Sequence, residues 1–293
     1  PYAVISLGSE ADVDKAVAAA RRAFGTWSRT SREERLAALE RLLDAYKARL
    51  EDMAQAISQE MGAPIRLARD SQAPVGVSHI KSFIRALQAF EFEHPLDARN
   101  PQHLVAREPI GVAGLITPWN WPMNQVVLKV VPALAVGCTV VLKPSEIAPM
   151  SSIVFAEIMG AAGFPAGVFN MVNGDGPTVG EAMSRHPGID MMSFTGSTRA
   201  GVAVSKASAD TVKRVALELG GKSPNLVFAD TDVEAAVVRG LDHVFENTGQ
   251  SCNAPTRMLV ERPVYDRAVE IAAAHAKTVR VGNPAEDGDH IGP

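Results

Sequence analysis

The sequence has only two cysteines among its 293 residues, Cys138 and Cys252, and this scarcity excludes several classes of protein. Two unpatterned cysteines provide neither a disulfide framework nor a zinc site, and they favour a reducing, cytoplasmic setting. The 7 histidines show no metal-ligand spacing, so no metal is expected.

Basic charge and long apolar runs are equally scarce. The 29 lysines and arginines are outnumbered by 33 aspartates and glutamates, so nucleic acid is not an expected partner. No apolar run approaches the roughly 18 residues of a membrane span, and the start lacks the pattern of a signal peptide. We therefore expect a globular protein that does not bind a membrane, long enough for two domains.

Both ends of the sequence look cut. The chain begins at Pro1 rather than at a methionine, and it stops at Pro293 shortly after Asp287-Gly288-Asp289, without a closing element. We therefore expect a fragment of a longer chain.

The first ninety residues have the pattern of helices. Ser9 with Asp12, and Ser31 with Glu34, form capping-box patterns ahead of helical segments. A glycine and a proline at 62 and 64 end this pair, and an irregular helical stretch covers 65–92. The segment 94–109 is expected to be a connection, with a possible strand at 103–107.

From residue 111 onward, short apolar strands alternate with helices. Strands are expected at 111–117, 139–142, 168–172, 191–195 and 214–217, and helices at 123–136, 151–162, 178–185 and 199–207. This alternation is typical of a Rossmann-like parallel sheet covered on both faces, which binds ligands at the carboxyl ends of its strands. After Gly220-Gly221 the rhythm restarts with a strand at 225–228, a helix at 232–247, a strand at 257–260 and a helix at 263–279.

The position of Cys252 is unlike that of Cys138. Cys252 lies in a loop of glycine, serine and asparagine between a helix pattern and a strand pattern, where a thiol is displayed rather than packed. From this context alone, an inert cysteine is the commoner alternative. Cys138 lies in an apolar run and is predicted to be a small buried hydrophobe.

Two strand ends place polar residues directly after an apolar run. In 118–122, two prolines stiffen a loop in which the Asn120 amide is suited to stabilising an oxyanion. A turn with structural tryptophans is the alternative. In 143–146, Lys143 and Glu146 suit ribose hydroxyls, with the carboxylate as acceptor. A Ser-Glu pair that caps the next helix is at least as plausible there.

Two further strand ends, at 194–198 and 217–224, are rich in glycine. The segment 194–198 leads into a helix whose first N–H groups suit a pyrophosphate, although the G-x-G-x-x-G fingerprint occurs nowhere in the chain. The glycine-rich segment 173–177, which follows the preceding predicted strand, could be a simple turn with no ligand-binding role. Glu218, ahead of Gly220-Gly221, is either a surface charge or a desolvated carboxylate that acts as a base near neutral pH.

Together these motifs resemble those of the aldehyde dehydrogenase superfamily, over essentially the whole chain. The matching segments stand in the family's order at 118–122, 143–146, 194–197, 218–224 and 249–252. Trp121 departs from the phenylalanine that is frequent there. The family's chain also continues well beyond Pro293, with the rest of the catalytic domain, a second cofactor-contacting glutamate and an oligomerisation arm.

The resemblance implies an NAD(P)-dependent, non-acylating enzyme that oxidises an aldehyde to a carboxylic acid. Cys252 attacks the carbonyl, and the Asn120 amide and the Cys252 backbone N–H hold the oxyanion. Hydride passes to the nicotinamide, and Glu218 activates the water that hydrolyses the thioester. The alternatives are a CoA-acylating enzyme, a thiol esterase and a non-catalytic binding protein on the same scaffold.

The resemblance also assigns the cofactor contacts and the domains. The cofactor residues are Thr117, Pro118, Trp119, Lys143, Ser145, Glu146, Gly176, Phe194, Gly196, Ser197, Leu219 and Gly220. Glu146 favours NAD because a carboxylate repels a 2′-phosphate, although Lys143 beside it leaves NADP possible. Residues 1–219 are expected to form the dinucleotide-binding domain, with a helical region over 1–93, a connection over 94–110 and the parallel α/β region over 111–219. Residues 220–293 are expected to be an incomplete α/β catalytic domain, and the full-length protein a homodimer or homotetramer.

Overall fold

Capping motifs fix the starts of the first two helices, as the sequence predicts. In the computed structural model, which describes residues 3–292, α1 (Glu10–Trp27) follows Ser9, whose backbone N–H donates to the Asp12 carboxylate at 3.0 Å. α2 (Arg32–Ala48) follows Ser31, whose side chain and backbone N–H both bond to Glu34. The backbone leaves helical geometry at Arg49, so a separate helix, α3 (Leu50–Met61), comes next.

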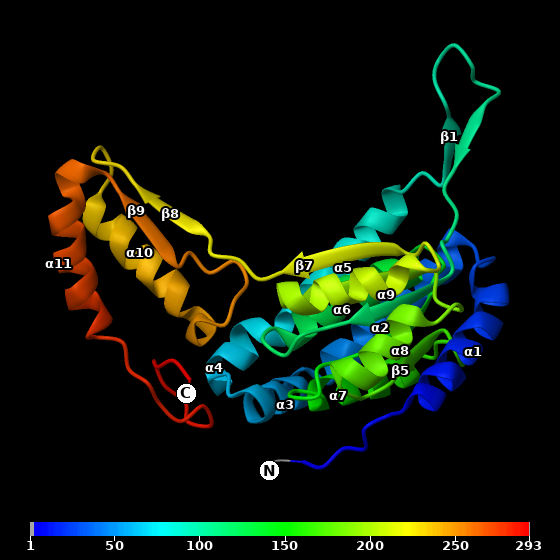
Figure 1. Ribbon diagram of the computed structural model, residues 1–293, viewed down its shortest axis with the longest axis horizontal. Coiled ribbons are helices and arrows are strands. Elements are labelled where there is room, and N and C mark those ends of the chain that lie inside the picture. The colour runs from blue at the N-terminus through cyan, green and yellow to red at the C-terminus, as the bar shows by residue number, and fades with distance from the viewer. Residues whose placement is uncertain (1–2, 293) are drawn as a thin grey trace.

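The irregular stretch that follows contains a π-helical turn. It consists of α4 (Ile65–Leu67), the π-helix η1 (Ala68–Gln72) and α5 (Pro74–Ala89). The connection to the sheet then forms an antiparallel ribbon of β1 (Glu93–Pro95) and β2 (Leu104–Ala106). Figure 1 shows this ribbon projecting away from the body of the molecule. β2 lies where a strand was predicted, whereas β1 has no apolar pattern that would reveal it.

A five-stranded parallel sheet forms the centre of the first lobe, confirming the predicted Rossmann-like α/β fold. Its order is β5-β4-β3-β6-β7. The chain adds β4 and β5 on one side of β3 and then crosses to add β6 and β7 on the other side, so the strand order reverses between β3 and β6. The strands are β3 (Val112–Ile116), β4 (Thr139–Lys143), β5 (Phe169–Met171), β6 (Met191–Gly196) and β7 (Arg214–Leu219). The point of reversal is where open parallel sheets bind ligands.

Helices cover both faces of this sheet (Figure 1). Successive residues of β4 serve two cores, because Val140 and Leu142 pack on the face covered by α2 and α5, while Val141 packs on the face covered by α1. The later helices of this lobe are α6 (Pro122–Ala135), α7 (Met150–Ala161), the π-helix η2 (Gly176–Gly180), α8 (Glu181–Arg185) and α9 (Thr198–Ala209). β3 and β4 are buried along their whole length, and burial on both faces explains their almost continuously apolar sequence.

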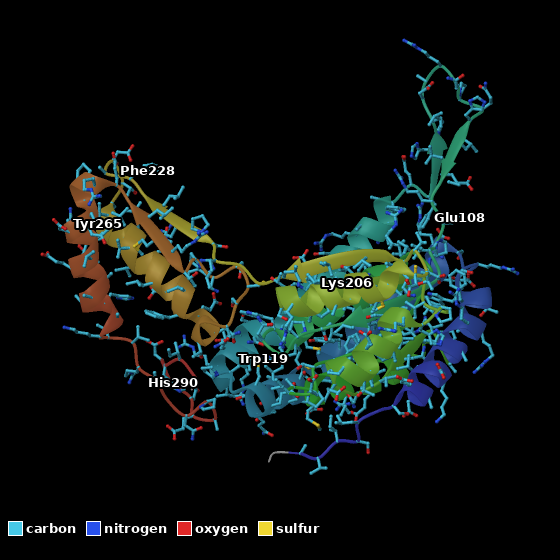
Figure 2. The ribbon with its side chains drawn as sticks, viewed as in Figure 1. Glu108, Trp119, Lys206, Phe228, Tyr265 and His290 are labelled. Carbon is cyan, nitrogen blue, oxygen red and sulfur yellow. The ribbon has the colours of Figure 1, made fainter. Side chains whose placement is uncertain are left out.

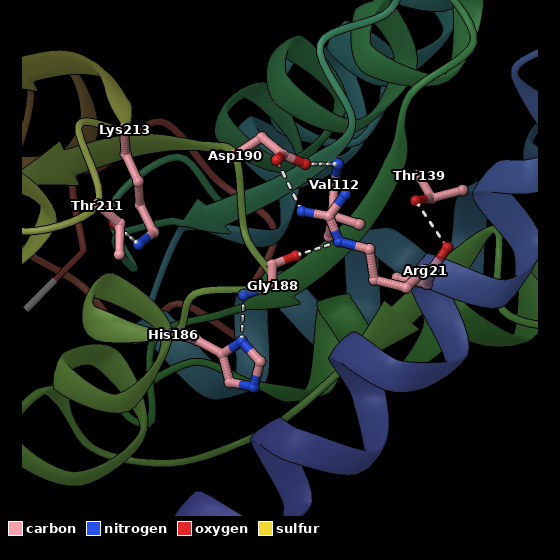
Figure 3. A network of polar contacts seen from close by, with 9 residues as sticks. Arg21, Val112, Thr139, His186, Gly188, Asp190, Thr211 and Lys213 are labelled. Carbon is pink, nitrogen blue, oxygen red and sulfur yellow. Dashed lines mark hydrogen bonds and ion pairs between the residues drawn. The ribbon is translucent and has the colours of Figure 1, made fainter.

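Asp190 ties the amino ends of the strands to α1. Its carboxylate accepts a hydrogen bond from the Val112 N–H at 2.7 Å and pairs with Arg21 at 2.7 Å (Figure 3). Arg21 also donates to the Gly188 carbonyl. Gly111 has φ +131°, and a Cβ there would lie 1.8 Å from the Asp190 carboxylate, so only glycine fits. This network lies at the edge of the sheet opposite the carboxyl ends.

The second lobe begins after the chain leaves β7. It contains β8 (Pro224–Val227), α10 (Val233–Phe245), the 3-10 turn η3 (Glu246–Gly249), β9 (Arg257–Val260), η4 (Arg262–Val264) and α11 (Tyr265–Ala276). The parallel pair β8–β9 is backed by a small core of Val227, Val233, Val237 and Ala268. Its other face carries the exposed Leu226 and Leu259, and the exposed Phe228 and Tyr265 line the same surface. Phe228 and Tyr265 are labelled in Figure 2. Across residues 3–292, no helix combines the length and apolarity that crossing a membrane would need.

Candidate active site

A cleft of about 320 Å³ lies at the carboxyl ends of β3, β6 and β7, where the two lobes meet. The structure brings together here four of the segments singled out in the sequence. The cleft is lined by 118–120, 195–197, 219–222 and 249–252, together with Gln125. Trp119, which lies on its wall, is labelled near the junction of the lobes in Figure 2. Cys252 is exposed, and Cys138 is buried in the sheet lobe as predicted.

The loop that carries Cys252 has a strained start. Asn247, Thr248 and Gly249 all have left-handed backbone angles, with φ values of 52°, 56° and 72°. The left-handed region costs a non-glycine residue about 1–3 kcal/mol and persists only where surrounding contacts enforce it. The loop must therefore be held by specific interactions.

A chain of side-chain amides supplies those interactions. Gln72 Nε2 donates to Asn247 Oδ1 at 2.7 Å, and Asn247 Nδ2 donates to the Asn120 carbonyl at 2.8 Å. Asn120 Nδ2 in turn donates to the Gln250 carbonyl at 2.7 Å. Gln72 and Asn247 are buried, so the bond between them is protected from competition with water. The chain links η1 to both walls of the cleft and fixes the Asn120 amide beside the cysteine loop.

The indole of Trp121 adds a second link. Its Nε1 donates to Ser251 Oγ at 2.8 Å, directly before Cys252 in sequence. The Trp121 side chain therefore positions the cysteine loop, which agrees with the stiff loop expected after β3. Substituting phenylalanine, which is frequent at this position in the resembling family, would remove this donor.

Two polar atoms of the cleft are buried and have no hydrogen-bond partner within residues 3–292. They are Asn120 Oδ1 and Thr195 Oγ1. Buried polar atoms are nearly always paired, so each of these two calls for a partner such as a water or a ligand. Close by, Ser197 caps α9, and a Cβ added at Gly220 would meet nothing within 4 Å. The residues therefore fit a polar ligand that approaches the backbone closely.

Glu218 is an exposed carboxylate and not a desolvated one. It lies on β7 and precedes the lining residue Leu219 without lining the cleft itself. It pairs in register with Thr195, so both side chains project from the face of the sheet that α6 covers. The catalytic role that the resemblance assigns to Glu218 therefore stays a prediction.

Lys129, which no motif in the sequence singled out, lies on the same face. Its Nζ donates to Ser193 Oγ at 2.8 Å. Burial lowers the pKa of the Lys129 ammonium to about 8, while attraction to the nearby Glu218 carboxylate opposes this shift. The signal in the sequence was a lysine that is the single charged residue of the helix pattern 123–136.

A second group of predicted residues lies at the carboxyl end of β4. Lys143 is buried, and its Nζ lies 3.1 Å from Glu146 Oε2. Glu146 remains 42% exposed, so it can still accept hydrogen bonds from a ligand. The Thr117 N–H donates to the Lys143 carbonyl and joins this strand end to that of β3.

The remaining predicted residues have supporting positions. Ser145 is buried and its Oγ accepts from the Ile147 N–H, while Gly176 begins η2 in open space. Phe194 is buried beneath Gly196, where an added Cβ would lie 2.6 Å from the ring. In residues 3–292, no three His, Cys, Asp or Glu side chains cluster as metal ligands would.

The comparisons with known proteins point to one family. The model of the "Aldehyde dehydrogenase family" matches residues 1–293. A 3-succinoylsemialdehyde-pyridine dehydrogenase of a Pseudomonas species is 53% identical over 99% of this chain and 60% of its own length. The chain thus spans about 60% of the length of the curated relatives it matches.

Solved structures give the same result. An aldehyde dehydrogenase from Bartonella henselae is 56% identical, with a TM-score of 0.97 over 99% of this chain and 60% of that one. Aldehyde dehydrogenase C of Pseudomonas syringae, solved in complex with NAD⁺ and octanal, is 51% identical. Its TM-score is 0.92 over 95% of this chain and 57% of its own.

Proposed function

This chain belongs to the aldehyde dehydrogenase family, and from that premise we propose that the protein oxidises an aldehyde to a carboxylic acid with NAD as hydride acceptor. The observation that carries the proposal is the 2.7 Å hydrogen bond from the Asn120 amide to the Gln250 carbonyl. It holds an amide donor beside the loop of the exposed thiol of Cys252, although the two residues are far apart in sequence.

In the first step, the Cys252 thiolate attacks the aldehyde carbonyl carbon, and the carbonyl oxygen becomes an oxyanion. The Asn120 amide and the Cys252 backbone N–H are proposed to stabilise this charge, because donors fixed in advance need no reorganisation as the charge develops. The network through Gln72 and Asn247 supplies that fixation.

The second step expels hydride from the carbon of the thiohemiacetal and leaves a thioester on Cys252. When bound, NAD supplies a nicotinamide ring that accepts this hydride. Hydrolysis of the thioester then requires a deprotonated water, and Glu218 is proposed as the base that activates it. The thiol is thereby returned to its starting state, and a carboxylic acid leaves.

The residues proposed to hold the dinucleotide run along the strand ends. Lys143 and Glu146 suit the adenosine ribose, and the exposed Glu146 carboxylate disfavours a 2′-phosphate. Trp119 and Ser197 suit the pyrophosphate, with Gly196 allowing close approach at the start of α9. We assign residues 1–219 to cofactor binding and 220–293 to the portion of the catalytic domain that carries the nucleophile.

The experiment is an assay of NADH formation with NAD and octanal, without coenzyme A. The Cys252→Ala variant is expected to abolish turnover while binding NAD normally, and Cys138→Ala is the matched control. Turnover that survives Cys252→Ala would remove this thiol from the mechanism. If NADH formed only in the presence of coenzyme A, the acyl group would be transferred to the thiol of coenzyme A and not hydrolysed by water.

A further inference from the structure

A second hollow lies at the amino-end side of the sheet, remote from the cleft. Its volume is about 420 Å³, and it opens near the base of the β1–β2 ribbon, where Glu108 is labelled in Figure 2. Three arginines line it, Arg29, Arg35 and Arg107, against a single carboxylate, Glu108. The remaining walls come from the ends of α1 and α6 and from Phe92. Its charged lining therefore carries a net positive charge.

Arg35 is the unusual member of this group. It is only 6% exposed, and its Nε is buried without a hydrogen-bond partner. Within the chain from residue 3 to residue 292, no carboxylate lies within ion-pair distance of its guanidinium. Its acidic helix neighbours Glu33 and Glu34 are exposed, and Glu34 is engaged in the cap of α2.

Nearby contacts do not balance this charge. The Arg35 guanidinium lies 5.2 Å from the centre of the Phe92 ring, and the guanidinium of Arg32 lies 5.8 Å from the same ring. Two cations therefore share one aromatic ring, which can attract a face of each guanidinium but accepts none of the in-plane N–H bonds. Burial lowers the pKa of Arg35, yet a guanidinium keeps its proton in proteins, so the charge persists. A buried sulfur nearby, that of Cys138, belongs to a thiol whose pKa is raised by burial.

We propose that this hollow binds an oxyanion, a carboxylate or phosphate group, with Arg35 as its floor and Arg29 and Arg107 at its rim. A guanidinium presents parallel N–H donors that match two oxygens of either group. Arg29 and Arg107 are exposed. The Arg107 guanidinium donates one N–H to the Glu91 carbonyl at 2.9 Å and lies 5.5 Å from the centre of the Phe90 ring, so its other N–H groups remain for a ligand. The anion supplies the countercharge that the described chain does not provide. This site is independent of the proposed dehydrogenase chemistry.

Two sources have this chemistry, a free anion and a carboxylate on a second copy of the chain. Isothermal titration of the protein with inorganic phosphate tests the first source. Saturable 1:1 binding is expected, lost in Arg35→Met and weakened about tenfold or more in Arg107→Gln, since each removes a charge-assisted hydrogen bond. Arg66→Met, an exposed arginine outside the hollow, is the matched control and is expected to bind phosphate normally.

Sedimentation at several protein concentrations tests the second source. Self-association that phosphate reverses, and that Arg35→Met abolishes, would identify the carboxylate of a second copy as the ligand and would support the site. If Arg35→Met fails to fold, the exposed Arg107→Gln variant decides the result. Absence of both phosphate binding and association in the wild type would overturn the proposal. Phosphate binding by Glu108→Gln alone would also overturn it, because Glu108 would then be the internal counter-ion.

Discussion

The side-chain amide of Gln72 lies 2.7 Å from the side-chain oxygen of Asn247, although 175 residues separate them in sequence. This bond joins the π-helical turn of the first lobe to the strained turn that precedes Cys252. Asn247 also donates to the backbone carbonyl of Asn120. The buried side chain of Gln72 therefore influences the positions of both the proposed nucleophile, Cys252, and the proposed oxyanion donor, Asn120.

Replacing Gln72 with leucine is therefore expected to lower kcat by about tenfold to a hundredfold, the range for misplaced catalytic groups. KM for NAD is expected to change little, because η1 contributes none of the proposed cofactor contacts. Steady-state kinetics check this, with the exposed Gln59→Leu on α3 as control. An equal loss in kcat and in NAD affinity would indicate general unfolding instead of a positioning role.

The Glu218→Gln variant separates the two halves of the proposed reaction. It is expected to give a first burst of NADH followed by a steady state slowed by about 10²–10⁴-fold, the usual contribution of a general base. Stopped-flow absorbance measures both phases. A burst that disappears together with the steady state would place Glu218 before thioester hydrolysis, at deprotonation of the thiol.

Lys129 makes the stability of the protein depend on pH. Its pKa is lowered to about 8 in the folded state, whereas the unfolded chain keeps the proton up to about pH 10.4. The unfolded state therefore binds more protons between these values, and the free energy of unfolding is expected to rise with pH across this window. Below about pH 8 the full cost of the buried charge is present.

Lys129→Met removes that dependence. At pH 7 the variant is expected to be more stable than the wild type by about 1–3 kcal/mol, because a buried charge is replaced by an apolar chain of similar size. Urea unfolding at pH 7 and pH 9.5 checks this, and the difference is expected to narrow at the higher pH. Lys206→Met, on α9, is the control. A difference that is constant with pH would contradict the lowered pKa.

Asp190 is expected to matter for stability and not for the proposed chemistry. Asp190→Ala leaves the Val112 N–H without its acceptor and removes the ion pair of Arg21, which keeps only its bond to the Gly188 carbonyl. The loss is expected to cost about 2–3 kcal/mol. Thermal unfolding measures the loss, and Asp210→Ala at the end of α9 is the control. Below the melting transition NAD binding is expected to be retained, since the network lies at the opposite edge of the sheet.

Most helices and strands could be predicted from the sequence because local residue patterns determine them. Ser31 with Glu34 marked the start of α2, and the apolar runs at Val112 and Thr139 marked buried parallel strands. The break at Arg49 and strand β1 were missed, because neither has a local signal and each depends on packing against distant elements.

The strand ends that line the candidate site could be predicted from the sequence, but the hydrogen bonds that join them could not. The loops at Asn120 and Thr195 were expected to lie close together, since parallel strands end at one edge of a sheet, whereas only the resemblance placed the Cys252 loop beside them. All three loops line one cleft. Gln72 could not be found from sequence, because its partner is a side chain in the other lobe. Asn247 did carry a signal, since asparagine followed two residues later by glycine tolerates left-handed backbone angles.

The small core of the second lobe determines which part of the chain is expected to unfold first. Its buried apolar cluster comprises Val227, Val233, Val237 and Ala268, whereas the sheet lobe has two extensive cores. Local opening follows the number of buried apolar contacts, so amide hydrogens of α10 and α11 are expected to exchange with deuterium before those of β3 and β4. Cys252 lies in the lobe that is expected to open first. Mild denaturant is therefore expected to abolish the proposed activity while most of the secondary structure is retained.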